Sequence, residues 1–268
     1  MTGELREDEQ LRPLPHLRTE QGVLGRVRRQ ARLFADLQVS TVDASVRPWL
    51  SQRSGHLLEV GCGDQPYRSL VPADCKYVGL DIEQAFDGCD PEVVRFDGKR
   101  FPFRSAAFDS VFHTEVLEHV FETRRFLAEC SRVLKPGGSM MFSVPFQARF
   151  HYIPDDYFRF TPSAISQLLA EAGFGEIAIS SRGTDVTVAA YKVVSVFYRW
   201  ALGGLLHKLL FMLFSPVVVV ALLVAHLSIR QGLGSPDDCL GYTVSAVRRD
   251  LSSQSVEATD GPVHKCSA

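Results

Sequence analysis

The segment LLEVGCGD, residues 57–64, decides the fold, because it is a short apolar run that ends in a glycine turn. Runs of this kind, bounded by turn residues, are typical of buried strands. Gly61 and Gly63 can adopt positive φ and let the backbone approach a ligand, because neither carries a Cβ atom. We therefore expect a strand over residues 56–60 that leads into a ligand-binding turn.

Short apolar runs alternate with helix-length stretches on both sides of this turn. The predicted strands cover residues 56–60, 76–80, 92–95, 108–113, 139–144, 176–180 and 241–248. Helices are predicted over residues 25–50, 121–134 and 161–171. This alternation indicates an α/β fold, a seven-stranded, mostly parallel, Rossmann-like sheet with helices on both faces. In such a sheet the ligand site lies at the carboxyl ends of the strands.

The composition of the chain disfavours some classes of function. The chain has 268 residues, 46% of them hydrophobic and 22% charged, which is typical of a globular protein. Its net charge of −2 gives no reason to expect a nucleic-acid partner. The six cysteines are dispersed without a C-x-x-C pair or a histidine cluster. We therefore expect no metal site and a reducing, cytoplasmic compartment.

A long apolar run interrupts the predicted fold before its last strand. From Leu209 to Ile229 the chain has 21 residues without Asp, Glu, Lys or Arg, which reaches the length of a membrane-spanning helix. A single crossing would separate residues 241–248 from the sheet. We favour a monotopic hairpin on the cytoplasmic face of a membrane. A fully spanning hairpin and a buried dimer or cap element remain alternatives.

The same reasoning divides the chain into five parts. We predict a flexible polar tail over residues 1–24 and a ligand-binding domain with N-terminal helices over residues 25–185. The apolar, membrane-associated helical insertion covers residues 186–232. The final strand lies within residues 233–250, and a second flexible tail follows over residues 251–268.

A carboxylate and the glycine turn together predict a nucleoside site. Asp81 ends the second predicted strand, 18 residues after Gly63. A carboxylate there can accept hydrogen bonds from both hydroxyls of a ribose. The alternative is a tight turn beside an exposed aspartate. A dinucleotide site needs a third glycine where this chain has Pro66, and no tyrosine is followed by lysine four residues later, so hydride transfer is disfavoured.

Four stretches resemble the class I S-adenosylmethionine-dependent methyltransferases, the broad family that includes ubiquinone/menaquinone-type enzymes. They are LLEVGCGDQPY at 57–67, YVGLDI at 77–82, RFDGKRFPFRSAAFDSVFHTEVLEHV at 95–120 and FLAECSRVLKPGGSMMFSVPF at 126–146. Residues 151–174 also resemble a segment of bacterial members linked with cell-surface glycan or lipid metabolism. The resemblance implies a methyltransferase sheet and S-adenosyl-L-methionine as cofactor.

The resemblance also assigns cofactor-binding residues along the carboxyl ends of the strands. Those assigned to the methionine part are Glu59, Gly61, Cys62 and Gly63. Those assigned to the adenosine part are Asp81 on the ribose, Ile82 on the adenine ring, and Phe96, Asp97 and Gly98 at the adenine amino group. Those assigned to the sulfonium end are His113, Thr114 and Glu115.

The segment after the fifth strand carries the candidate catalytic residues. A hydroxyl acceptor must lose its proton, which usually needs His, Asp or Glu within hydrogen-bond reach. We predict His151 as the base, with Asp156 or Tyr157 orienting the acceptor. The alternative is a surface lid in which Asp156 pairs with Arg159. His119, just before a predicted helix, is expected to have a structural role.

The sequence therefore predicts a methyltransferase that acts on a small or lipid-linked acceptor at a membrane surface. One alternative is a non-catalytic, membrane-tethered scaffold with the same fold. Another is a nucleotide-dependent oxidoreductase, which Pro66 disfavours.

Overall fold

The computed structural model describes residues 23–82, 92–151 and 154–250. Most of the predicted N-terminal tail, residues 1–22, and all of the predicted C-terminal tail lie outside these ranges. Residues 23 and 24, predicted as part of the first tail, begin a helix.

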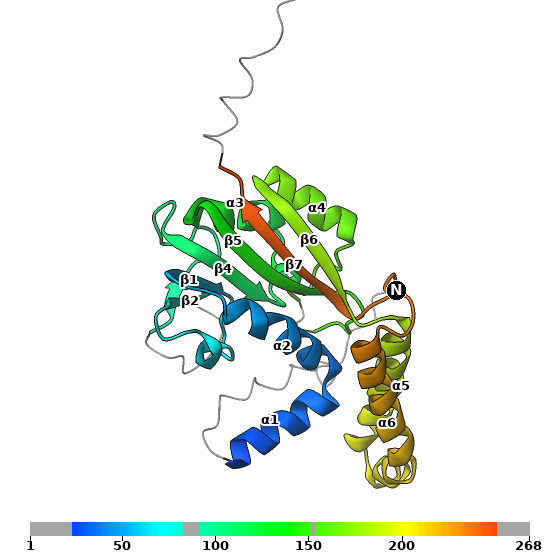
Figure 1. Ribbon diagram of the computed structural model, residues 1–268. Helices are drawn as coiled ribbons and strands as arrows, with labels where there is room; N and C mark the ends of the chain where they lie inside the picture. Colours follow the sequence, from blue (N-terminus) through cyan, green and yellow to red (C-terminus); the bar gives the residue numbers. More distant parts are fainter. Residues whose placement is uncertain (1–22, 83–91, 152–153, 251–268) are drawn as a thin grey trace, which may run out of the picture.

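A seven-stranded sheet of order β3-β2-β1-β4-β5-β7-β6 forms the centre of the molecule (Figure 1). The strands are β1 (His56–Val60), β2 (Lys76–Ile82), β3 (Val94–Phe96), β4 (Phe108–Thr114), β5 (Leu134–Pro145), β6 (Phe174–Arg182) and β7 (Gly241–Arg248). Strands β1 to β5 pair in parallel, whereas β7 is antiparallel to both β5 and β6. The predicted mostly parallel sheet is confirmed.

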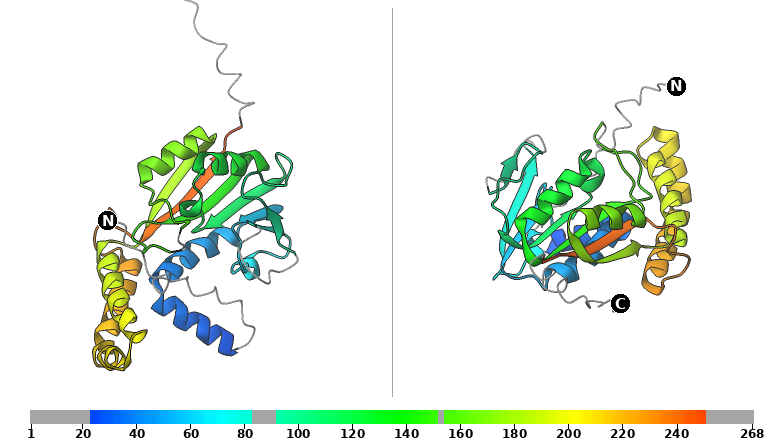
Figure 2. Two further views of the ribbon diagram at one scale, coloured as in Figure 1. Left: turned by 180° about the vertical axis from the view of Figure 1, so that it is seen from behind. Right: turned by 90° about the horizontal axis from the view of Figure 1, so that it is seen from above.

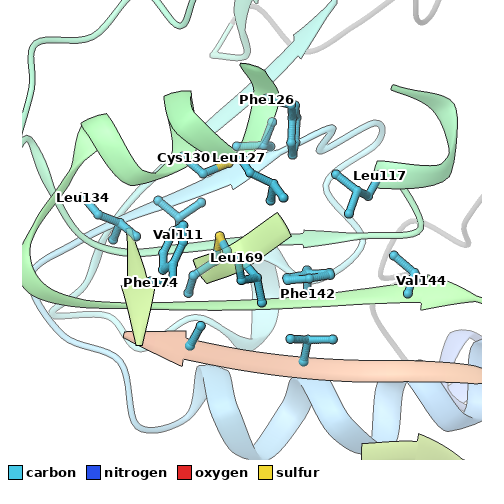
Figure 3. Packing of buried hydrophobic residues seen from close by; sticks show 14 of the residues in the cluster. Val111, Leu117, Phe126, Leu127, Cys130, Leu134, Phe142, Val144, Leu169 and Phe174 are labelled. Carbon is cyan, nitrogen blue, oxygen red and sulfur yellow. The ribbon is translucent and has the colours of Figure 1, made fainter. Parts of the chain in front are cut away.

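Helices cover both faces of the sheet, as predicted. They are α1 (Val23–Ala35), α2 (Leu37–Leu50), α3 (Thr123–Val133), α4 (Pro162–Glu171), α5 (Asp185–Ala201) and α6 (Leu205–Gln231), with short 3-10 turns η2 (Arg68–Leu70) and η3 (Leu117–His119). Helices α3 and α4 bury Leu127 and Leu169 against one face, where Figure 3 shows them beside Phe142. On the other face α2 packs Val46 and Leu50 against the sheet.

The start of β5 differs from the sequence prediction. The sequence predicts a helix up to residue 134 and a strand that begins at Ser139, but the strand begins at Leu134. Phe108 pairs with Leu134 and Ser110 with Ser139, so residues 135–138 form a bulge opposite Asp109. The Lys135 ammonium lies 2.6 Å from an Asp109 carboxylate oxygen and holds this bulge against β4.

Helices α5 and α6 form an antiparallel hairpin that projects beyond the sheet (Figures 1 and 2). The hairpin follows Arg182 of β6 and precedes Gly241 of β7, and these two residues are register partners. Gly241 also pairs with Pro145 at the carboxyl end of β5. The hairpin therefore leaves the sheet at the carboxyl edge of its parallel strands. The predicted hydrophobic helical insertion before the last strand is confirmed.

Buried hydroxyls fasten the base of the hairpin. Ser228 of α6 lies 2.8 Å from the Thr184 hydroxyl oxygen and 3.0 Å from that of Thr187. Ser228 also donates to the carbonyl of Leu233 at 2.8 Å. All three hydroxyl side chains are buried. Buried polar groups need hydrogen-bond partners, and these hydroxyls find theirs in each other and in the Leu233 carbonyl. The cluster therefore fixes the position of the end of α6 against the start of α5.

We expect Gly241→Ala to lower the free energy of unfolding by about 1–3 kcal/mol, the usual cost of overpacking. A Cβ at Gly241 would lie 2.2 Å from the Arg182 guanidinium and 2.3 Å from the Val144 carbonyl oxygen, so β7 would have to shift. Gly204→Ala is the matched control, because a Cβ there meets nothing within 4 Å. Equal denaturation midpoints for the two variants would contradict this account.

Candidate functional site

The glycine turn after β1 is held against the end of β2. Gly61 and Gly63 have φ of +67° and +48°, in the left-handed region that glycine adopts readily. The Gly63 N–H donates to Asp81 Oδ2 at 2.7 Å, and the Ile82 N–H donates to Asp81 Oδ1 at 2.8 Å. A Cβ at Gly61 would lie 2.5 Å from a Val116 methyl group. The turn therefore depends on glycine and on the Asp81 carboxylate.

Glu59 lies beneath this turn and is 2% exposed. Its carboxylate accepts a hydrogen bond from the Tyr77 hydroxyl. Burial raises the pKa of Glu59 to about 8, although the Tyr77 hydrogen bond opposes the shift. Cys62, the next side chain on this turn, is also buried, and burial raises the pKa of its thiol.

The predicted adenine-binding residues come together at the ends of β2 and β3. Ile82 is 40% exposed, although it is apolar. A Cβ at Gly98 would lie 3.7 Å from an Ile82 methyl group, so the two positions are neighbours. Asp97 accepts from the Lys99 N–H at 2.9 Å, and this hydrogen bond lowers the pKa of Asp97. Phe96 instead points into the core.

The three residues predicted at the sulfonium end have different surroundings. His113 is fully buried, stacks on Phe142 with ring centroids 4.7 Å apart, and has no hydrogen-bond partner among the described residues. Burial lowers the pKa of His113 to about 3. Thr114 ends β4 and is partly exposed. Glu115 has φ of +52°, and its Oε1 accepts from the Arg182 guanidinium at 2.9 Å. Their contact with the cofactor stays a prediction.

The loop between β5 and α4 brings two of the predicted catalytic residues together. His151 Nδ1 lies 3.3 Å from Asp156 Oδ2. The backbone N–H of His151 donates a hydrogen bond to the same oxygen at 3.1 Å. Asp156 also receives both Arg159 Nη groups, at 2.6 and 2.8 Å, so the pair considered as the alternative is present. Tyr157 is 43% exposed and donates to Asp155 at 2.7 Å.

Two residues next to His151 were not predicted as site residues. Glu118 is fully buried, and its Oε1 lies 3.6 Å from His119 Nε2 and 3.8 Å from His151 Nε2. Burial raises the pKa of Glu118. The sequence did contain a signal for these two residues, since Glu118 and His119 come just after the fourth predicted strand. Residues that follow β4 and β5 meet at one edge of a parallel sheet, which brings this pair close to His151.

The residues at this edge fit S-adenosylmethionine. Gly61 lets the turn pack directly against Val116, where any other residue would place a Cβ in contact with that side chain. Each Asp81 oxygen accepts one backbone N–H and keeps a lone pair for a ribose hydroxyl. Ile82 offers an exposed apolar surface to an adenine ring.

We expect the stability of the wild-type protein, relative to Glu59→Gln, to fall as pH rises. Above the ordinary glutamate pKa of 4.5, Glu59 is ionised in the unfolded chain but stays protonated in the folded protein up to about pH 8. Folding then takes up a proton, so the free energy of unfolding decreases by up to about 1.4 kcal/mol per pH unit. Urea denaturation of both proteins between about pH 5.5 and about pH 7.5 measures this difference. A difference that does not change with pH would contradict the prediction.

Comparison with known proteins agrees with this geometry. Residues 58–142 match the family model for a methyltransferase domain. A probable S-adenosylmethionine-dependent methyltransferase of Mycolicibacterium smegmatis is 33% identical over 102 residues, which cover 35% of this chain and 39% of that protein. Phthiotriol/phenolphthiotriol dimycocerosates methyltransferase of Mycobacterium tuberculosis is 39% identical over 97 residues, covering 31% and 34%.

The matched segments therefore span less than half the length of these curated relatives. The crystal structure of a methyltransferase from Archaeoglobus fulgidus, dependent on S-adenosylmethionine, superimposes with a TM-score of 0.51 at 16% identity, over 80% of this chain and 95% of that chain. This likeness shows the fold. Residues 58–142 therefore match a methyltransferase domain, and together with the glycine turn, Asp81 and the sheet order this match supports a class I S-adenosylmethionine-dependent methyltransferase.

Proposed function

We propose that the protein transfers a methyl group from S-adenosylmethionine to a small or lipid-linked acceptor at the cytoplasmic surface of a membrane. The observation that carries the proposal is the position of the α5–α6 hairpin. It leaves the sheet beside Pro145 and Arg182, at the same edge that carries the glycine turn and Asp81. A membrane bound by the hairpin would then lie near the acceptor side of the site.

The surface of α6 supports a lipid environment. The helix is long and apolar enough to cross a membrane, with a mean hydropathy of 2.5, and 11% of its most apolar window is buried inside the protein. Its exposed apolar side chains include Leu205, Leu209, Met212, Leu213, Val217, Val220, Leu223 and Leu227. An apolar surface of this extent is rarely left in water.

Helix α1 offers a second amphipathic surface. Val23, Leu24 and Val27 are 70%, 63% and 58% exposed, and Arg26 and Arg28 lie on the same helix. Helix α1 and the hairpin both project from the same end of the sheet (Figures 1 and 2). Basic residues beside exposed apolar side chains are typical of helices that bind anionic lipid headgroups.

The dimensions of the hairpin favour a monotopic arrangement. Helix α5 has 17 residues, so it is about 26 Å long, which is shorter than the roughly 30 Å hydrocarbon core of a bilayer. Arg199 and Lys208 flank the tip of the hairpin and would enter the hydrocarbon if the tip crossed it. Both observations support a hairpin in the interface, with β7 returning to the sheet on the side it left.

A lipid-linked acceptor is supported by one of the relatives. The mycobacterial protein with 39% identity is named for methylation of phthiotriol and phenolphthiotriol dimycocerosates, which is a lipid-related activity. When bound, S-adenosylmethionine supplies a methyl group already activated on a sulfonium. The chain must align the acceptor with that methyl group and exclude water, and alignment alone contributes about 7–11 kcal/mol.

The loop between β5 and α4 is the part of the chain that we assign to the acceptor. His151 is the side chain assigned to removal of an acceptor proton, because the Arg149 carbonyl oxygen, 2.9 Å from Nδ1, holds its ring and Asp156 Oδ2 lies 3.3 Å from the same atom. Tyr157, which is partly exposed beside Phe121, is assigned to orienting the acceptor.

We expect Asp81→Asn to weaken binding of S-adenosylhomocysteine at least about tenfold, because charge-assisted hydrogen bonds contribute about 1.5–3 kcal/mol. Calorimetric titration of the detergent-solubilised protein measures the affinity. Asp109→Asn is the matched control, because Asp109 lies near the amino end of β4 and pairs with Lys135. A folded wild-type protein that binds neither adenosyl ligand would favour the scaffold, and one that binds NADH instead would favour the oxidoreductase.

We expect the wild-type protein to co-sediment with vesicles that contain phosphatidylglycerol. Leu213→Glu combined with Val220→Glu should weaken this binding at least about tenfold, because a carboxylate in hydrocarbon costs more than about 2 kcal/mol. Both positions are exposed on α6. Gln167→Glu adds a charge on α4 and serves as the control. Wild-type protein that stays in the supernatant without detergent would contradict membrane docking.

A further inference from the structure

We propose that Glu118, His119 and His151 bind a divalent transition-metal ion at the acceptor side of the site. One potential ligand atom from each residue lies within 4.8 Å of the others. The Glu118 oxygen is 3.6 Å from one histidine Nε2 and 3.8 Å from the other. Ligands of a tetrahedral zinc ion at 2.0–2.1 Å are separated by about 3.4 Å. Small side-chain movements would therefore complete the site.

Both histidine rings are held from the side that faces away from Glu118. His119 Nδ1 lies 2.6 Å from the carbonyl oxygen of Asp155, and His151 Nδ1 lies 2.9 Å from that of Arg149. A carbonyl oxygen only accepts, so each Nδ1 carries the proton and donates it. In its neutral form each ring therefore has its lone pair at Nε2, which is the arrangement in which histidine binds metal.

Among the described residues, Glu118 is the carboxylate of this cluster whose ion-pair partners are histidines and not an arginine or a lysine. Asp156 is paired with Arg159, and Glu115 with Arg182. The Glu118 oxygens are buried, and in the described part of the chain the two histidine Nε2 atoms lie 3.6 and 3.8 Å from Oε1, longer than an ordinary hydrogen bond. A buried carboxylate is costly unless it is paired or binds a metal. A cation between Glu118 and the two Nε2 atoms would satisfy it.

The backbone holds the three ligands in place across two loops. The Glu118 carbonyl accepts from the Tyr157 N–H at 2.9 Å, which joins η3 to the loop after β5. Val116, just before η3, packs against Gly61 of the cofactor turn. The proposed metal site is therefore next to the turn assigned to the methionine part of the cofactor, and both parts are built on rigid strand ends.

The ligand set indicates the class of metal and its role. Two imidazoles and one carboxylate suit Zn²⁺, Fe²⁺, Co²⁺ or Mn²⁺, and three protein ligands leave a coordination position open. This role rests on the proposed function: the metal ion would act as a Lewis acid on an acceptor hydroxyl at the open position, which would pass its proton to solvent water more readily and face the methyl group, whose transfer releases S-adenosylhomocysteine. With the metal ion bound, His151 would act as a metal ligand, and this role would replace the direct removal of the acceptor proton assigned to it above.

Direct metal binding tests the proposal without any need for turnover. The full-length, detergent-solubilised protein is treated with a chelator and titrated with Zn²⁺ by calorimetry, and with Co²⁺ by visible absorption. We expect one ion per chain and cobalt absorption bands typical of nitrogen and oxygen ligands. Glu118→Gln and His151→Ala should weaken binding by at least about 100-fold. His56→Ala is the control, because His56 lies at the amino end of β1.

S-adenosylhomocysteine binding, measured on the same samples, separates this proposal from the proposed function. Glu118→Gln should keep that binding, which shows that the variant is folded, and should lose the rise in melting temperature that Zn²⁺ gives the wild-type protein. Metal binding that both variants retain would overturn the site. So would a wild-type protein that binds the adenosyl ligand but no metal ion. Absence of adenosyl binding alone would count against the proposed function and leave the metal result standing.

Discussion

The buried guanidinium of Arg182 joins the elements on which the site depends. It is 3% exposed and donates to Glu115 Oε1 at 2.9 Å, to the Val144 carbonyl at 3.1 Å and to the Gln38 carbonyl of α2 at 3.4 Å. A buried charge must keep such partners, because removing one leaves it uncompensated. The ends of β4, β5 and β6 are therefore held in one arrangement. Gly241 is part of the same constraint, since a Cβ there would occupy the place of the guanidinium.

The contacts of Arg182 also connect the α5–α6 hairpin to the strand ends that carry the candidate site. The hairpin begins three residues after Arg182, and its base is fixed by the buried Ser228 hydroxyl. A surface that docks on lipid through α6 would thus be attached rigidly to the strand ends that carry Glu115 and Asp81. Under the proposed function, such an enzyme would not need to extract a lipid-linked acceptor far from its membrane, which would be the advantage of a hairpin at this edge.

Local sequence signals predicted most of the fold, and long-range contacts account for what was missed. The strands 56–60 and 241–248 were predicted with the bounds that the structure has, because turn residues border each run. The start of β5 was wrong, since the bulge at residues 135–138 is held by Asp109 of another strand. His113 was assigned to the cofactor from the resemblance, and no local signal showed that it is buried and stacked on Phe142. The contact between His119 and His151 could not be read from local sequence, because the two are 32 residues apart and the parallel pairing of β4 and β5 brings them together.

The backbone at Glu115 connects these observations. Its φ of +52° is unfavourable for a residue with a side chain, and such conformations persist where the surroundings enforce them. Here the Glu115 carboxylate accepts from Arg182 and from the Ser143 hydroxyl at 2.8 Å, which holds the turn after β4. That turn sends Val116 against Gly61 and Glu118 toward His151. One ion pair therefore positions both the residue that supports the cofactor turn and the carboxylate of the proposed metal site. Loss of the Arg182 charge should disturb the two sites together, whereas Glu118→Gln should disturb the metal site alone.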